Sequence, residues 1–216
     1  MPANSLYGKL DDGVFIMYHR KSDDYPLIVK PRKWTSLQNN GEIAAGVAIV
    51  EGGKILVVAP TQATTKLTWS SEEVSGGGTT TWDKVTALND WNGKTNTQKQ
   101  IAASKEGAVT NTASYAPGFC NLYSRSNANG KGLTAGKWWL PSLGEMMMIY
   151  ANMTKVNYAL SLISGATRLV EDAYWTSTEA SAAGAWGLHF SDGHASGDLN
   201  KASNQRYVRA VSAFIS

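Results

Sequence analysis

The last third of the chain constrains the fold most strongly, because bulky aromatic residues there are separated by runs of small and polar residues. It opens on Tyr-Trp-Thr-Ser-Thr-Glu at 174–179, and its later aromatic residues include Trp186 and Phe190. Aromatic and β-branched residues favour strands, and an Asp-Gly pair between two such runs favours a hairpin turn. The pattern predicts a C-terminal antiparallel sheet with a turn at Asp192-Gly193 and strands at 174–178, 185–190 and 206–214.

Bulky side chains are expected to hold this region in place from inside. A buried tryptophan removes on the order of 200 Å² from water, so we expect four of them to point inward: Trp138, Trp139, Trp175 and Trp186. Arg206 and Arg209 alternate with apolar residues in the closing segment. We expect these two arginines to turn toward acidic partners, with Glu145 and Glu179 as candidates.

The first 60 residues predict further strands. An apolar run at 13–18 follows an Asp-Gly turn signal, and two more apolar runs at 44–50 and 54–59 flank Glu-Gly-Gly at 51–53. Two such runs around a Gly-Gly pair are typical of a hairpin. Their almost continuous apolar character indicates that both faces of the hairpin are covered.

Two short helices are predicted. Apolar residues at positions 82, 85 and 88 have helical spacing within 82–91. The run Ser-Leu-Gly-Glu at 142–145 is a capping box, which starts a helix that continues through Ala151. A further short helix at 157–162 is open, whereas 92–97 is expected to be a turn and 106–136 mostly irregular. These elements together predict the α+β class.

Size and composition narrow the class of protein further. The chain has 216 residues, which suits one domain or one domain with an N-terminal extension. Its net charge is only +3 and no Lys/Arg cluster is present, so a nucleic-acid partner is not expected. No apolar run is long enough for membrane insertion, and no secretory signal peptide opens the sequence. We expect a soluble protein, either cytoplasmic or built into something larger.

No set of residues predicts catalysis, a metal site or a cofactor. Cys120 is the single cysteine, so an internal disulfide is impossible, and a buried structural thiol is the better interpretation. His189 and His194 have no third metal ligand, and their spacing puts them on opposite faces of a strand unless the turn intervenes. Acidic residues in the same region are interpreted as solvated loop charges rather than a catalytic pair.

Two interpretations remain open for the polar segment 180–205. It is rich in small side chains and turn residues and lies between structural aromatic residues. It is either an ordinary surface loop or a face that binds a ligand, because binding residues concentrate on loops that a rigid scaffold positions.

The ordered motifs of the chain resemble a known family. Trp-Trp-Leu-Pro-Ser-Leu-Gly-Glu at 138–145 resembles the W-x-LPS-x-x-E motif of a family of C-type lectin-like domains. The run at 174–179 resembles its YW-S/T-S-T-E motif, and Val-Arg-Ala-Val at 208–211 resembles its closing pattern. The match covers about residues 40–216. Within this fold the chain is most similar to the variable proteins of diversity-generating retroelements, which include phage tropism determinants at the tips of tail fibres.

The resemblance implies an α+β, C-type lectin-like fold with two short helices, irregular loops and a C-terminal antiparallel sheet. It implies a lectin-like domain at 41–216, after an N-terminal β-rich segment at 1–40, with a variable region at 174–214. Twelve positions between the apparently fixed anchors would display diversified, ligand-binding side chains to solvent: Ala180, Ala182, Gly184, Gly187, His189, Ser191, Asp192, His194, Ser196, Gly197, Asp198 and Leu199.

The function implied is receptor binding without catalysis. The expected partner is a protein or glycan receptor on a cell surface, and the expected location is a phage virion or a cell-surface assembly. A homo-oligomer, such as the trimer common among tail-fibre relatives, remains open. Formylglycine-generating enzymes share the fold class but need two reactive cysteines, and the acidic-Pro-Asn loop of calcium-dependent lectins is absent. The alternative is a bacterial surface or fimbrial-type adhesin or lectin domain that is not diversified.

Overall fold

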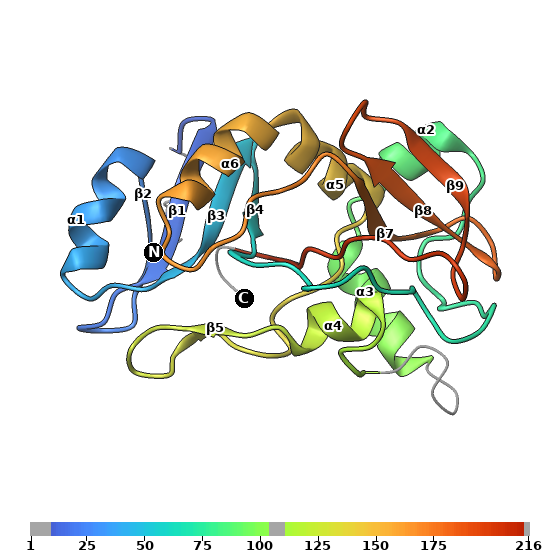
Figure 1. Ribbon diagram of the computed structural model, residues 1–216, viewed down its shortest axis with the longest axis horizontal. Helices are drawn as coiled ribbons and strands as arrows, with labels where there is room; N and C mark the ends of the chain where they lie inside the picture. The colour runs from blue at the N-terminus through green and yellow to red at the C-terminus, as the bar shows by residue number, and fades with distance from the viewer. Residues whose placement is uncertain (1–9, 104–110, 214–216) are drawn as a thin grey trace, which may run out of the picture.

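The computed structural model describes residues 10–103 and 111–213, which form an elongated α+β arrangement (Figure 1). All pairings between its named strands are antiparallel, as the sequence predicts for this class. The strands form a five-stranded, a three-stranded and a two-stranded sheet. Along the chain they are β1 (Gly13–His19), β2 (Pro26–Val29), β3 (Ala44–Glu51), β4 (Lys54–Val58), β5 (Arg125–Ser126), β6 (Gly132–Leu133), β7 (Ala173–Glu179), β8 (Gly184–His189), β9 (Ala195–Asn200) and β10 (Val211–Ser212).

The five-stranded sheet has the strand order β10-β4-β3-β1-β2. The predicted hairpin of β3 and β4 is confirmed, with Glu51 opposite Lys54 and two glycines of positive φ in the turn. Alternate residues of β3 enter different core clusters, Val47 and Ile49 on one face and Ala48 and Val50 on the other. Both faces of the hairpin are therefore covered, as its apolar pattern predicts. Because β1 lies between β2 and β3, this sheet joins residues on both sides of the predicted boundary at 40/41.

The three-stranded sheet, β7-β8-β9, confirms the predicted C-terminal sheet and the turn at Asp192-Gly193. The predicted strand at 206–214 is mostly wrong. Within 206–213 only Val211–Ser212 forms a strand, β10, and position 214 lies outside the described residues. Strand β10 pairs with β4 of the other sheet. The third strand of the C-terminal sheet is β9, whose Ser-Gly-Asp sequence has low strand propensity.

The described residues contain six α-helices rather than two. The predicted helices at 82–91 and 142–151 are confirmed as α2 and α5, and the capping box of α5 is present. The segment 92–97 was predicted to be a turn, which is wrong because α3 begins at Gly93. The helices are α1 (Trp34–Asn39), α2 (Lys84–Leu88), α3 (Gly93–Ala102), α4 (Ala116–Leu122), α5 (Leu143–Ala151) and α6 (Met153–Ser161).

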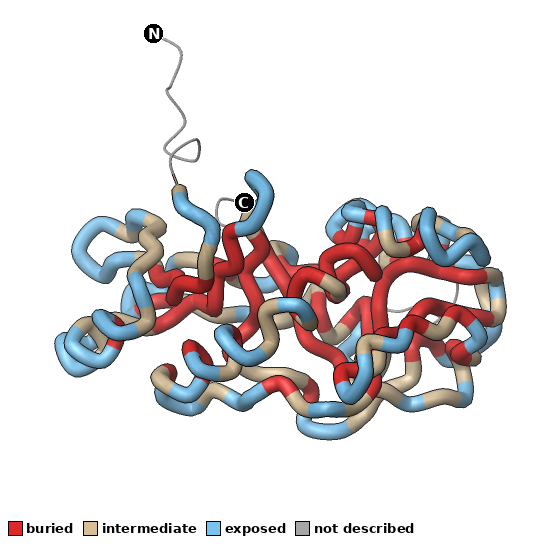
Figure 2. The backbone as a smooth tube through the Cα atoms, turned by 90° about the horizontal axis from the view of Figure 1, so that it is seen from above, coloured by how far each residue is buried: buried red, intermediate tan, exposed pale blue. Residues whose placement is uncertain are grey.

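Buried residues run through the middle of the molecule (Figure 2), and their two core clusters lie on opposite faces of β3. In Figure 1, α6 lies along the five-stranded sheet, and α5 lies between the two sheets. All four tryptophans that we expected inside are buried, at 138, 139, 175 and 186. No helix in the described ranges combines the length and the apolar character that a membrane span requires.

Candidate ligand-binding surface

The twelve predicted residues differ in exposure: some are exposed, some half-buried and some buried. Five are exposed and His189 and Ser196 are half-buried; the exposed ones are Ala182, Ser191, Asp192, His194 and Asp198. The prediction that all twelve side chains point to solvent is wrong for the five buried residues: Ala180, Gly184, Gly187, Gly197 and Leu199.

Close packing explains why the buried positions do not display side chains. A Cβ atom at Gly187 would lie 2.5 Å from Cδ1 of Leu199, and one at Gly197 would lie 2.9 Å from the indole of Trp186. A Cβ atom at Gly184 would lie 2.9 Å from the carbonyl oxygen of Gly197. Contacts below 3.0 Å force neighbouring atoms to move. The tip of Leu199 can turn aside, but at Gly187 the carbonyl oxygen of Tyr174 in β7 is also only 3.0 Å away. The packing of β8 between β7 and β9 therefore leaves little room for side chains at these three glycines.

The six polar residues among the twelve all lie in the β8–β9 hairpin, and all of them except Ser191 are treated as one patch. We call His189, Asp192, His194, Ser196 and Asp198 the hairpin patch. The rings of His189 and His194 have centroids 5.9 Å apart, because the intervening turn brings the two histidines together. The backbone N–H of His194 donates to Oδ1 of Asp192 at 2.9 Å. The hydroxyl of Ser196 donates to the carboxylate of Asp198, and this bond holds the pKa of Asp198 below its usual value.

The turn between β8 and β9 packs against helix α5. Gly193 has a φ of +74°, a left-handed conformation that glycine adopts without steric cost. A Cβ atom at Gly193 would lie 2.7 Å from the ring of Tyr150, so the turn backbone rests directly on α5. The ring centroid of Tyr150 lies 5.4 Å from that of Phe190. These aromatic contacts fix the position of the hairpin relative to the core.

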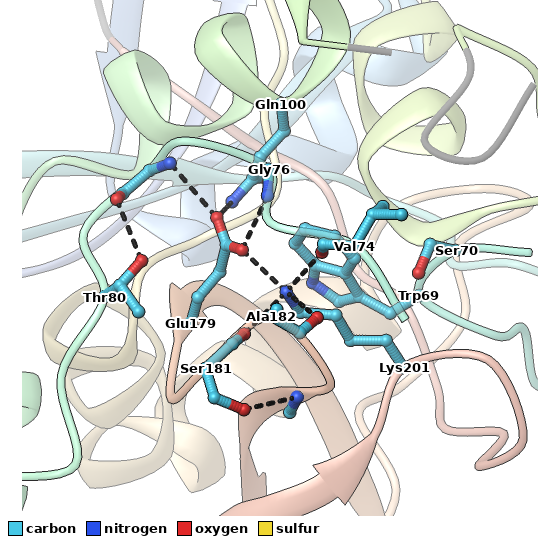
Figure 3. A network of polar contacts seen from close by, with 12 residues as sticks. Trp69, Ser70, Val74, Gly76, Thr80, Gln100, Glu179, Ser181, Ala182 and Lys201 are labelled. Carbon is cyan, nitrogen blue, oxygen red and sulfur yellow. Dashed lines mark hydrogen bonds and ion pairs between the residues drawn. The ribbon is translucent and has the colours of Figure 1, made fainter. Parts of the chain in front are cut away.

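A buried ion pair lies beneath the loop between β7 and β8 (Figure 3). Nζ of Lys201 lies 2.6 Å from Oε2 of Glu179, and both side chains are completely buried. The ammonium group also donates to the carbonyl oxygens of Val74, Ser181 and Ala182 at 2.9–3.0 Å. Burial lowers the pKa of Lys201, and the charge of Glu179 opposes that shift.

Glu179, the acidic member of the pair, also binds the backbone of a second loop. Its carboxylate accepts hydrogen bonds from the backbone N–H groups of Gly76 and Gly78, at 2.8 and 3.1 Å, and from Nε2 of Gln100. The network therefore joins the loop at 74–78, α3 and the loop at 181–183. It fixes the backbone on either side of exposed Ala182.

Arg209 does not pair with Glu145 or Glu179, so that prediction is wrong. Its buried guanidinium donates to four oxygen atoms, the carbonyl oxygens of Ala59, Thr167 and Arg168 and Oε1 of Gln62. Burial lowers the pKa of Arg209 to about 10. Main-chain carbonyls replace the expected acid, because Glu179 is already paired with Lys201. Arg206 instead donates to the carbonyl oxygen of its neighbour Gln205.

Asp90 is a structural residue at the centre of a second buried network. Its Oδ2 accepts from the hydroxyl of Thr178 and the side-chain amide of Asn96, each at 2.8 Å. Its Oδ1 accepts from the backbone N–H of Asn92 at 3.0 Å. Protein donors thus occupy both oxygens, and they connect the start of α3 to β7.

Potential metal-ligating side chains are dispersed in the part of the chain that the structure describes. The described residues contain no group of three or more His, Cys, Asp or Glu side chains that could hold an ion. Cys120 is buried as predicted, and burial raises the pKa of its thiol well above its usual value. A buried thiol in its protonated form is a poor nucleophile.

Fold and site together define an α+β domain with antiparallel sheets that exposes a polar hairpin. No family model and no curated protein matches the chain. Among solved structures, the chain is similar to a fimbrial protein from Bacteroides ovatus ATCC 8483, with a TM-score of 0.54 and 17% sequence identity. The similarity covers 94% of this chain and 49% of that protein, so the chain spans about half its length. At this identity the similarity concerns the fold alone.

Proposed function

We propose that the chain is a non-enzymatic binding module, in which the hairpin patch contacts a receptor on a cell surface. The observation that carries this proposal is the polar, exposed patch on a hairpin whose backbone is held by buried aromatic side chains. A preformed surface loses little conformational freedom on binding, which favours affinity. The patch combines imidazole, hydroxyl and carboxylate groups, which suit hydrogen bonding to a glycan or to a polar protein surface.

The fimbrial-type adhesin is the form of this function that we favour. The similar structure is a fimbrial protein, and fold similarity of this kind supports a related surface role without establishing it. The chain would act within a larger surface assembly, with a protein or glycan receptor as its partner.

A binding screen tests this function. Labelled protein is applied to an array of cell-surface glycans and to immobilised mucin, fibronectin and collagen. We expect saturable binding to at least one of these, and its loss in the variant Asp192→Ala/His194→Ala/Asp198→Ala. The control variant Asp11→Ala/Lys33→Ala changes exposed residues near the N-terminal sheet and should bind normally. Equal binding by the hairpin variant would contradict the proposal.

A second candidate is a diversified receptor-binding protein with a C-type lectin-like fold at 41–216. The motif resemblance at 138–145 and 174–179 favours it. Packing at the three clashing glycines would confine diversification to exposed positions of the twelve. Deep sequencing of the 3′ end of the gene across a population tests this candidate. Substitutions at Asp192, His194 and Asp198, copied from an adenine-bearing template repeat, would support it, whereas a uniform sequence would contradict it.

A further inference from the structure

A cavity of about 250 Å³ opens between the start of β4, Trp91 and α5. Lys54 and Leu56 line it from β4, and Glu145 and Met148 line it from α5, with Trp139 beside them. None of the twelve predicted positions lines this cavity. We call it the tryptophan pocket. Its volume lies below the range of roughly 300–1,000 Å³ found for drug-sized ligands, so it suits one small ring.

Aromatic surface and positive charge meet at the tryptophan pocket. Trp91 is 37% exposed, so part of its indole is accessible to a ligand. Nζ of Lys54 lies 4.4 Å from the ring centroid of Trp91, and Nζ of Lys94 lies 5.8 Å from that of Trp139. Neither lysine forms an ion pair within the part of the chain that the structure describes.

The acidic residue of the pocket is already engaged by the protein. Oε2 of Glu145 accepts from the indole N–H of Trp139 at 3.1 Å and from the backbone N–H of Ser142 at 2.9 Å. Burial raises the pKa of Glu145 to about 7, against these hydrogen bonds. Oε2 of this carboxyl group is therefore already occupied by two donors of the protein itself.

We propose that the tryptophan pocket binds a carboxylated pyranose, a uronic acid or a sialic acid at the end of a glycan. The C–H face of the ring contacts Trp91, and the ammonium group of Lys54 pairs with the sugar carboxylate. Nζ of Lys54 lies over the Trp91 ring, so the bound sugar takes its place on that face, and the displaced ammonium group pairs with the carboxylate at the edge of the ring. A neutral sugar would displace Lys54 from the ring without offering it a carboxylate, and a simple anion would not replace the contact of Lys54 with the indole face.

The test is an NMR titration of protein labelled with ¹⁵N at its tryptophans. Glucuronic acid and N-acetylneuraminic acid are added separately, up to about 50 mM, a concentration that saturates a site of millimolar Kd. Neutral glucose and benzoate are the comparison ligands. We expect a saturable shift of the indole N–H signal of Trp91 with one or both acidic sugars, and no shift of Trp82, which lies outside the pocket. A response to only one acidic sugar identifies the source.

Variants make the outcome decisive. Lys54→Gln should raise the Kd at least fivefold. Trp91→Ala, followed through the indole N–H signal of Trp139, which also lines the pocket, should abolish saturation. Lys33→Gln, on the exposed surface, should leave the Kd unchanged. Three results would overturn the proposal: no saturable shift with either acidic sugar, glucose binding as well as the acids, or benzoate binding equally well. The hairpin variant should retain this binding, so failure here and failure of the hairpin patch are distinguishable.

Discussion

At the scale of single residues, the buried pair of Lys201 and Glu179 matters most. Removing two charges from water costs several kcal/mol for each ion, and only good geometry offsets that cost. Here the ammonium group meets one carboxylate and three carbonyl oxygens, and the carboxylate meets two backbone N–H groups. The pair therefore holds two loops at a fixed separation beneath the exposed residues.

We predict that Lys201→Met destabilises the protein by about 3–5 kcal/mol, because Glu179 is left buried without a cation. Urea denaturation of both proteins measures this change. Adding Glu179→Gln should recover part of the loss, since the uncompensated charge is then removed. A loss below about 1 kcal/mol, the size typical of an exposed pair, would show that the pair does not anchor the loops.

Glu145 gives a prediction of pH dependence. Its pKa is raised to about 7 from 4.5, so the folded protein keeps this proton in a range where the unfolded chain has released it. The contribution of Glu145 to the free energy of unfolding is therefore largest below about pH 4.5 and falls as the pH rises to about 7. At 1.36 kcal/mol per pKa unit the total change is roughly 3 kcal/mol.

The matched variant is Glu145→Gln, which keeps an oxygen acceptor for Trp139 and Ser142 but does not titrate. Urea denaturation between pH 4.5 and 7.5 should give a flatter pH profile for the variant than for the wild type. Parallel profiles would mean that Glu145 titrates normally in the folded protein.

Some of these residue interactions were predictable from the sequence and others were not. The capping box was predictable, because Ser142 and Glu145 are three residues apart and their hydrogen bonds are local. The partner of Lys201 was not predictable, because Glu179 lies 22 positions away and no local pattern indicates that the lysine is buried. Arg209 was assigned the wrong partners because main-chain carbonyl acceptors leave no trace in the sequence.

At the scale of elements, the three-stranded sheet β7-β8-β9 separates buried residues from exposed ones. Trp175 is fully buried, whereas Asp198 is exposed and His189 is half-buried. We predict that Trp175→Ala costs roughly 3–5 kcal/mol, as large core truncations do. His189→Ala and Asp198→Ala should stay within about 0.5 kcal/mol of the wild type. Thermal and urea unfolding check this, and similar losses in all three variants would contradict the division.

The packed glycines give a second test of this element. We predict that Gly187→Val and Gly197→Val each cost at least about 1–3 kcal/mol, because added atoms would overlap Leu199 and Trp186. Ala182→Val, at an exposed position of the loop between β7 and β8, is the matched control and should be nearly neutral. Unfolding temperatures of the three variants give the comparison. Unchanged stability in both glycine variants would mean that the two strands can move apart.

Helix α3 illustrates what a periodic pattern misses. The segment 92–97 contains turn residues and no apolar stripe, so the sequence predicted a turn. In the structure the buried face of α3 is polar: Asn96 bonds to Asp90, and the amide of Gln100 donates to the carbonyl of Ser177 at 2.7 Å. Tertiary hydrogen bonds stabilise this helix, and hydrophobic periodicity cannot indicate them.

At the scale of the whole molecule, the closing segment ties the two larger sheets together. Tyr207 pairs with Tyr174 at the C-terminal sheet, and a few residues later β10 pairs with β4 of the N-terminal sheet. The sequence predicted strands and their antiparallel class but could not assign β10 to its sheet, because apolar residues of one strand suit many partners. The β8–β9 hairpin lies at one end of the elongated molecule (Figure 1).

The central claim is that this molecule is a rigid scaffold that binds through the hairpin patch. The most direct measurement is the affinity of Asp192→Ala/His194→Ala/Asp198→Ala for the ligand found in the binding screen, with its unfolding temperature measured on the same sample. We predict at least a tenfold higher Kd, about 1.4 kcal/mol, with the unfolding temperature nearly unchanged. An unchanged Kd, with the folded state intact, would contradict the claim and place binding elsewhere on the molecule.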